Sequence, residues 1–189
     1  MSANLMSLAR SGGKFLKLFG DRKMVRTLPY LRRVAYLESH GTEWIRIDSV
    51  YGQVVNNIIC KYEQMEPNPD NVSVFGRVDE AAYYFFGDLM WGSDYYKVVE
   101  GLNEIGPFDS SEEMNIPFYV FCSANLNEDH KPKFFITTKL YHLISDKFSL
   151  IPVLDFNNKP CLYDEVSGQL FYNQGTGEFT WGELDSQTT

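Results

Sequence analysis

Cysteine and histidine are the residue types in this chain that could supply a nucleophile with its base, or the ligands of a zinc ion. The three cysteines are Cys60, Cys122 and Cys161, and the three histidines are His40, His130 and His142. Structural zinc sites use such residues in close pairs, whereas these six stand far apart in the sequence. We therefore expect no metal site.

A cysteine nucleophile needs a histidine that the fold places beside it. Cys122 with His130 or His142 is the combination that the sequence offers. However, Cys122 follows the apolar run 118–121, and a cysteine in a buried strand behaves as a small hydrophobic residue. His130 lies in a polar stretch, where a solvated histidine is the ordinary outcome. We expect these thiols to be inert.

Carboxylates are plentiful, and a pair of them could act as general acid and base if apolar neighbours raised one pKa. The clusters are Asp109, Glu112 and Glu113, then Glu128 and Asp129, then Asp164 and Glu165. Such neighbours are lacking, so solvated surface is the simpler interpretation. Gly175-Thr176-Gly177 is typical of a turn and matches no phosphate-binding loop. The sequence therefore predicts a non-enzymatic protein without a cofactor.

The most unusual local feature is a stretch of aromatic and acidic residues at 83–96. It contains Tyr83, Tyr84, Phe85, Phe86, Asp88, Trp91, Asp94, Tyr95 and Tyr96. Aromatic rings anchor many protein interfaces, and carboxylates steer a basic partner toward them. The alternative is that the rings fill the core. We predict a partner-binding surface formed by Asp88, Trp91, Asp94, Tyr95 and Tyr96.

Charge is divided unevenly along the chain. The formal net charge is −8, but residues 1–33 carry a net charge of +7 and the remainder carries −15. An acidic body is a poor partner for free nucleic acid, because neutralising phosphates requires lysine and arginine. A basic protein surface is the partner that such a body favours.

The first 27 residues form a basic arm in which apolar residues recur at helical spacing. Its basic side chains are Arg10, Lys14, Lys17, Arg22, Lys23 and Arg26. A basic amphipathic segment can bind an anionic membrane surface or RNA. The alternative is a helix docked on its own domain. The arm lacks the small-residue cleavage site of a secretory signal.

Residues 28–183 are predicted to form a single domain, with 184–189 as a flexible tail. Leu28-Pro29 favours the start of a helix that Gly41 stops, and 93–102 favours a short second helix. Strands are predicted over 44–50, 53–62, 72–78 and 116–124, whereas 134–143 is either a strand or the start of a helix. Turn residues then separate the short segments 150–156, 161–163, 169–172 and 178–181. The predicted fold class is α+β, with a mostly antiparallel sheet, packed helices and a C-terminal β-meander.

Leu28-Pro29, with Gly41 after the expected helix and Trp44 opening a strand, resembles the opening of the SUKH superfamily. Val153-Leu154-Asp155-Phe156, Gly168-Gln169-Leu170-Phe171-Tyr172 and Glu178-Phe179 also look like strand passages of that family. The resemblance loosely covers residues 14–181. It implies an α+β fold used as a non-catalytic binding scaffold, in bacteria often an immunity protein that neutralises a toxin, with relatives in large DNA viruses. It carries over no catalytic residue.

Two functions agree with these observations. The first is a non-enzymatic, acidic and aromatic-rich protein-binding module that docks on a basic partner, such as a nuclease toxin. The second is a viral or phage structural protein of matrix type, whose basic arm binds membrane or RNA while the acidic body self-associates. An odd number of scattered cysteines favours a reducing, cytoplasmic compartment, and no apolar run approaches the roughly 20 residues of a membrane span.

Overall fold

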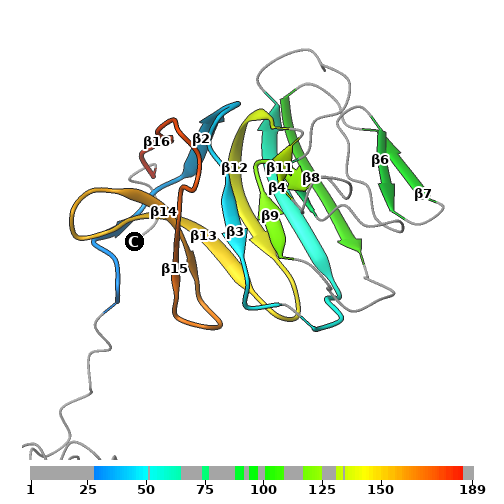
Figure 1. Ribbon diagram of the computed structural model, residues 1–189, viewed down its shortest axis with the longest axis horizontal. Coiled ribbons are helices and arrows are strands. Elements are labelled where there is room, and N and C mark those ends of the chain that lie inside the picture. The colour runs from blue at the N-terminus through cyan, green and yellow to red at the C-terminus, as the bar shows by residue number, and fades with distance from the viewer. Residues whose placement is uncertain are drawn as a thin grey trace, which may run out of the picture.

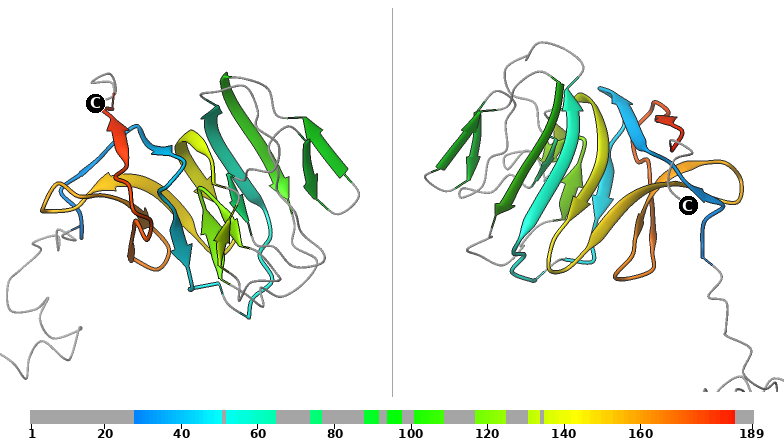
Figure 2. Two further views of the ribbon diagram at one scale, coloured as in Figure 1. Left: turned by 45° about the horizontal axis from the view of Figure 1, so that its top comes forward. Right: turned by 180° about the vertical axis from the view of Figure 1, so that it is seen from behind.

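The protein is described here by a computed structural model, shown in Figures 1 and 2. The structure describes residues 28–50, 52–64, 74–76, 88–91, 94–97, 101–108, 117–124, 131–133 and 135–184. Within these ranges every regular element is a β-strand. The predicted α+β fold with packed helices is therefore wrong, and the described part of the chain has a mainly β fold. It contains no helix of the length and hydropathy needed to cross a membrane.

The largest sheet has nine strands, and all of its pairs are antiparallel. Its main path runs β15-β14-β13-β12-β2-β16, while β1 pairs with β13 and β4 joins β12 to β8. The strands are β1 (Arg32–Arg33), β2 (Tyr36–His40), β4 (Ile58–Gln64), β8 (Gly101–Phe108), β12 (Thr137–Ile144), β13 (Ser149–Leu154), β14 (Pro160–Asp164), β15 (Leu170–Tyr172) and β16 (Thr180–Gly182). Figure 1 shows β8 toward one side of this sheet and β15 and β16 toward the other.

A three-stranded sheet packs against the large one. Its strands are β3 (Ile45–Ile47), β9 (Phe118–Val120) and β5 (Phe75–Gly76), with β9 in the middle. Buried side chains from both sheets form one core. At its centre the Phe118 ring lies 5.4 Å from Phe148 and 5.8 Å from Phe75. Two separate hairpins pair β10 (Ser123–Ala124) with β11 (Pro132–Lys133) and β6 (Asp88–Trp91) with β7 (Asp94–Lys97).

The helix predicted from Leu28 to Gly41 is absent because distant strands pair with this segment. Leu28 and Leu31, which helical spacing places on a buried face, are 45% and 49% exposed. In β2 burial instead alternates with period two, and Leu37 is fully buried opposite Leu140 of β12. The short helix predicted over 93–102 is also wrong, since this region contains β7 and the start of β8.

Several of the predicted strands are present in the structure. The antiparallel meander is confirmed for β13, β14 and β15. The last strand, β16, leaves the meander and pairs with β2, so that Thr180 lies opposite Glu38. Strands also form within 44–50 and 53–62, but these strands, β3 and β4, belong to different sheets and do not pair with each other. The return of β16 to β2 brings it close to the turn between β13 and β14.

Candidate functional site

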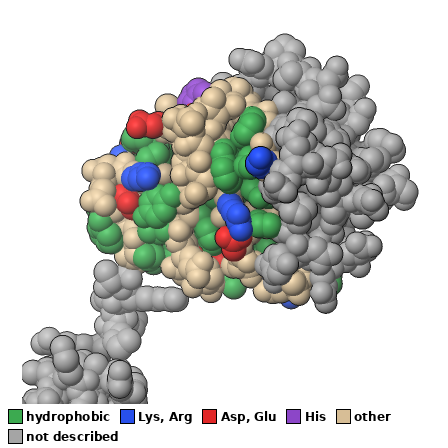
Figure 3. Space-filling view, in the orientation of Figure 1, with side chains coloured by type: hydrophobic (Ala, Val, Ile, Leu, Met, Phe, Trp, Pro, Cys, Tyr) green, Lys and Arg blue, Asp and Glu red, His purple; other side chains and the backbone are tan. Residues whose placement is uncertain are grey.

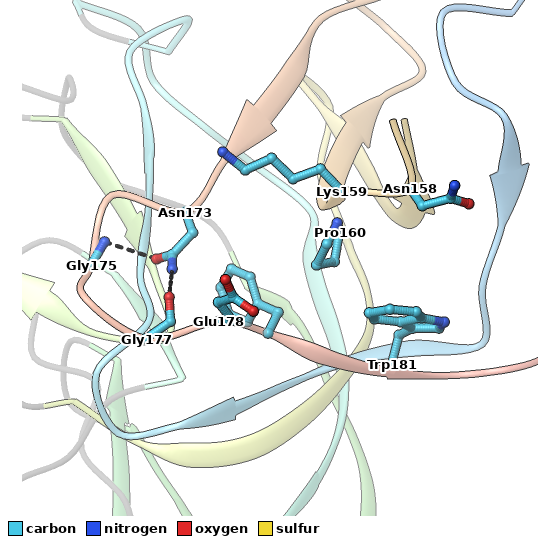
Figure 4. A pocket seen from close by; sticks show the side chains of 9 residues that line it. Asn158, Lys159, Pro160, Asn173, Gly175, Gly177, Glu178 and Trp181 are labelled. Atoms are coloured by element: carbon cyan, nitrogen blue, oxygen red, sulfur yellow. Dashed lines mark hydrogen bonds between the residues drawn. The ribbon is translucent and has the colours of Figure 1, made fainter. Parts of the chain in front are cut away.

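A pocket of about 410 Å³ lies between the β13–β14 turn and the segment 173–181 (Figure 4). One wall is the turn between β13 and β14, which contributes Asn158, Lys159 and Pro160. The other wall is the 173–181 segment, which runs from the end of β15 into β16. Concave sites between structural elements are common ligand sites.

Asn173 fixes the second wall. Its Oδ1 accepts hydrogen bonds from the backbone N–H of Trp44 at 3.1 Å and of Gly175 at 2.8 Å. Its Nδ2 donates to the Gly177 carbonyl at 2.6 Å (Figure 4). Gly175 and Gly177 lie so close to Thr42 and Glu43 that a Cβ at either position would clash. The segment is therefore held tightly against residues 42–44.

The buried carboxylate of Glu43 organises the turn that this segment packs on. It accepts hydrogen bonds from the backbone N–H of His40 at 2.6 Å and from the Thr42 hydroxyl at 3.1 Å. Burial acts to raise the pKa of Glu43, but these backbone and side-chain hydrogen bonds outweigh it and lower the pKa below its ordinary value. Glu43 is therefore an ionised structural group.

Asp155 has the same role in the opposite wall. It accepts hydrogen bonds from the backbone N–H of Asn157 at 2.7 Å and of Lys159 at 2.8 Å, and from the Tyr172 hydroxyl at 3.1 Å. Burial opposes these bonds, yet they prevail and lower the Asp155 pKa. The Lys159 ammonium lies 5.1 Å from the centre of the Tyr172 ring. Hydrogen bonds to Asp155 thus hold the turn, and its cationic side chain, Lys159, makes a cation–π contact with Tyr172.

The pocket offers an apolar surface together with one carboxylate. Phe179 is buried, and its ring packs 4.8 Å from that of Phe121 in the core. Trp181 is 38% exposed. Glu178 is exposed and has no hydrogen bond or ion pair with any residue that the structure describes. In Figure 4, Trp181 and Glu178 lie toward opposite ends of the pocket, with Pro160 between them.

The five residues predicted to bind a partner lie together on one hairpin. Asp88 and Trp91 belong to β6, whereas Asp94, Tyr95 and Tyr96 belong to β7. The two strands pair antiparallel, with Trp91 opposite Asp94. Figure 1 shows this hairpin at the opposite end of the molecule from β16, which contributes Trp181 to the pocket.

Several other predictions fall outside the described residues. All of the basic arm, 1–27, lies there, including Arg10, Lys14, Lys17, Arg22, Lys23 and Arg26. The same holds for His130, for the aromatic residues 83–86 and for the acidic clusters at 109–113 and 128–129. The structure does not test these predictions.

The three cysteines are buried and form no disulfide. Burial raises the pKa of all three thiols, that of Cys161 to about 12. Cys122 packs with Tyr119 near Trp44 and Phe135. Burial lowers the pKa of His142, and the charged groups that act on it are Glu104, Lys61 and Arg33. The structure therefore does not bring Cys122 and His142 together.

Of the carboxylate pair Asp164 and Glu165, Asp164 has a structural role. Asp164 was predicted to be solvated, but it is fully buried and accepts hydrogen bonds from the backbone N–H of Ser149, Val166 and Ser167 at 2.8, 3.1 and 3.2 Å. Its neighbour Glu165 is exposed. Among the described residues, no group of three histidine, cysteine or acidic side chains is arranged to hold a metal ion.

Charge is mixed on the face of the large sheet seen in Figure 1. Hydrophobic side chains alternate there with single basic and acidic ones, and no sign dominates the part that the structure describes (Figure 3). The described part of this face therefore carries no concentration of acidic side chains. The pocket was missed by sequence reasoning, which took Asn158 to Pro160 and Gly175 to Gly177 only as turn residues.

Comparisons with protein families, with curated proteins and with solved structures found no match to this chain. The resemblance to the SUKH superfamily therefore stays a prediction. The α+β fold that it implied does not agree with the mainly β fold of the described residues.

Proposed function

We propose that this protein is a non-enzymatic binding module whose acidic body docks on a basic partner protein. The observation that carries the proposal is the placement of Asp88, Trp91, Asp94, Tyr95 and Tyr96 on the single hairpin β6–β7. Acids and aromatic residues gathered on one element suit an interface in which charge speeds association and rings supply affinity. An inhibitor of a basic toxin is one protein of this kind.

The chemistry of the described groups supports a non-catalytic role. The three thiols are buried with raised pKa values, so they are protonated and poor nucleophiles at neutral pH. Glu43 and Asp155 have lowered pKa values, so they stay ionised and cannot act as general acids there. The cysteines are also free of disulfides, which supports a cytoplasmic location.

The test begins with capture of a basic protein by the full chain at low salt. The captured protein is then purified, and its association rate with the full chain is measured over a range of ionic strength. Replacing both Asp88 and Asp94 by lysine is expected to lower the low-salt association rate by about tenfold and to flatten its salt dependence, because electrostatic steering is lost.

A matched control places the same charge change elsewhere. Glu104→Lys with Glu165→Lys alters two exposed acids outside the hairpin, on β8 and after β14. This control should reduce the association rate less than the hairpin variant does. An unchanged rate and salt dependence in the hairpin variant, or an equal effect of the control, would refute docking through β6–β7.

The alternative of a matrix-type structural protein depends on residues 1–27, which the structure does not describe. Its test is binding of RNA and of vesicles containing anionic lipid by the full chain and by a chain that begins at residue 27. Binding by the full chain alone would favour this alternative over the proposed function.

A further inference from the structure

We propose that the pocket between the β13–β14 turn and β16 binds an arginine side chain of a partner protein. The guanidinium would lie at the Glu178 carboxylate, and the apolar stem of the arginine would lie against Trp181 and Pro160. This inference goes beyond the proposed function, because the pocket is a second contact surface for a basic partner, separate from the hairpin β6–β7.

Charge at the pocket favours a cation. Glu178 is exposed, and no described residue forms an ion pair or hydrogen bond with it. Among the described residues that line the pocket, Lys159 alone is basic, and its ammonium lies over the Tyr172 ring. The hydroxyl of the same tyrosine donates to the Asp155 carboxylate, which adds negative charge behind that ring. Lys159 and Asp155 therefore offset each other, and Glu178 is left without a counter-ion among the described residues.

The shape and polarity of the pocket favour a long amphipathic side chain. Its apolar part consists of Trp181, Pro160 and the buried Phe179, and its carboxylate lies at the other end from Trp181 (Figure 4). Arginine has an apolar stem that can cover such a surface while its charged head reaches a carboxylate. A planar guanidinium also binds a carboxylate through two parallel hydrogen bonds, which an ammonium cannot do.

Hydrogen bonds within the protein hold both walls of the pocket in place. Asn173 holds the 173–177 segment through three hydrogen bonds, and Asp155 holds the opposite turn through three more. A site of this kind loses little conformational entropy on binding. The pocket, at about 410 Å³, is larger than a single arginine side chain. Neighbouring residues of the partner protein would therefore make further contacts with it.

The experiment titrates the full chain with Nα-acetyl-arginine amide and follows the NMR signal of the Trp181 indole N–H. That signal is assigned by its loss in Trp181→Phe. Saturable binding in the millimolar range is expected for the arginine compound. The lysine analogue should bind at least about threefold more weakly, since it cannot form the two-point contact. The citrulline analogue, which has nearly the same shape without the charge, should not saturate.

Two variants give opposite predicted signs. Glu178→Gln should weaken the arginine compound about fivefold, the effect of losing one exposed charge-assisted contact. Lys159→Met should strengthen its binding about twofold, because a positive charge in the pocket lining, which repels the guanidinium, is removed. Glu104→Gln, an exposed acid on β8, is the matched control and should change nothing. Each substituted side chain is exposed, and an unchanged melting temperature checks that folding is intact.

Equal binding of the citrulline compound, absence of saturable binding, or no effect of Glu178→Gln would overturn the inference. The outcome is separable from that of the proposed function, because β6–β7 lies at the far end of the molecule (Figure 1). If the Asp88/Asp94 variant slows partner association but the arginine compound does not bind, only the pocket proposal is refuted. If the arginine compound binds but the Asp88/Asp94 variant leaves partner association unchanged, only docking through the hairpin is refuted.

Discussion

Replacing Asn173 by alanine should destabilise the protein and disturb the pocket. The asparagine accepts from the backbone N–H groups of Trp44 and Gly175 and donates to the Gly177 carbonyl. Each of these hydrogen bonds contributes about 1 kcal/mol net, and an N–H left without an acceptor costs about 1–3 kcal/mol. We therefore expect the free energy of unfolding to fall by about 2–4 kcal/mol.

The assay is unfolding in urea, monitored by tryptophan fluorescence. Asn173→Asp tests the donor, because it keeps an acceptor for the two N–H groups but places an oxygen, in place of Nδ2, against the Gly177 carbonyl. It should lose this hydrogen bond and leave the carbonyl facing an acceptor, at a cost of about 1–3 kcal/mol. Gln174→Ala is the control, since that exposed side chain makes only a 3.3 Å hydrogen bond to the Tyr172 carbonyl. A change below about 0.5 kcal/mol for Asn173→Ala, the size of an ordinary surface substitution, would refute the role of Asn173.

Three further predictions concern the same framework. Because Glu43 and Asp155 have lower pKa values when folded than when unfolded, the stability they provide is complete above their ordinary pKa values of 4.5 and 3.8 and is lost as the pH falls through the folded values. Urea unfolding at pH 7, 5 and 3 should show the free energy of unfolding falling toward acid. An equally large fall in Glu43→Gln would contradict the contribution of Glu43. All three thiols should resist a disulfide reagent in the native protein and react after unfolding; a fast native reaction is the opposing result. Gly175→Ala should destabilise the protein by at least about 1–3 kcal/mol, since its Cβ would meet the Thr42 backbone, whereas Gly168→Ala, at a turn with open space, should suffer only from its positive φ of 76°.

The C-terminal meander could be predicted because its signals are local. Asn157 to Pro160 and Ser167-Gly168 are turn residues between short apolar segments, and each such pair of segments forms a hairpin. Burial of Cys122 also followed from its apolar neighbours. Information of this kind is contained in a few adjacent residues.

The errors arose where pairing depends on residues distant in the sequence. The spacing of Leu28, Leu31 and Val34 suits a helix, but pairing with β13, β12 and β16 fixes this segment as strands. Tertiary context of this kind overrides helix propensity. The pocket depends on the same long-range contacts, because β16 reaches the β13–β14 turn only by returning to β2.

The central claim is that the acidic hairpin β6–β7 docks on a basic partner. The most direct measurement is the association rate with the purified partner as a function of ionic strength, for the full chain and for Asp88→Lys with Asp94→Lys. We predict a rate that falls steeply with salt in the unmodified chain and is about tenfold lower and nearly salt-independent in the variant. Identical rates and identical salt dependence for the two proteins would contradict the claim.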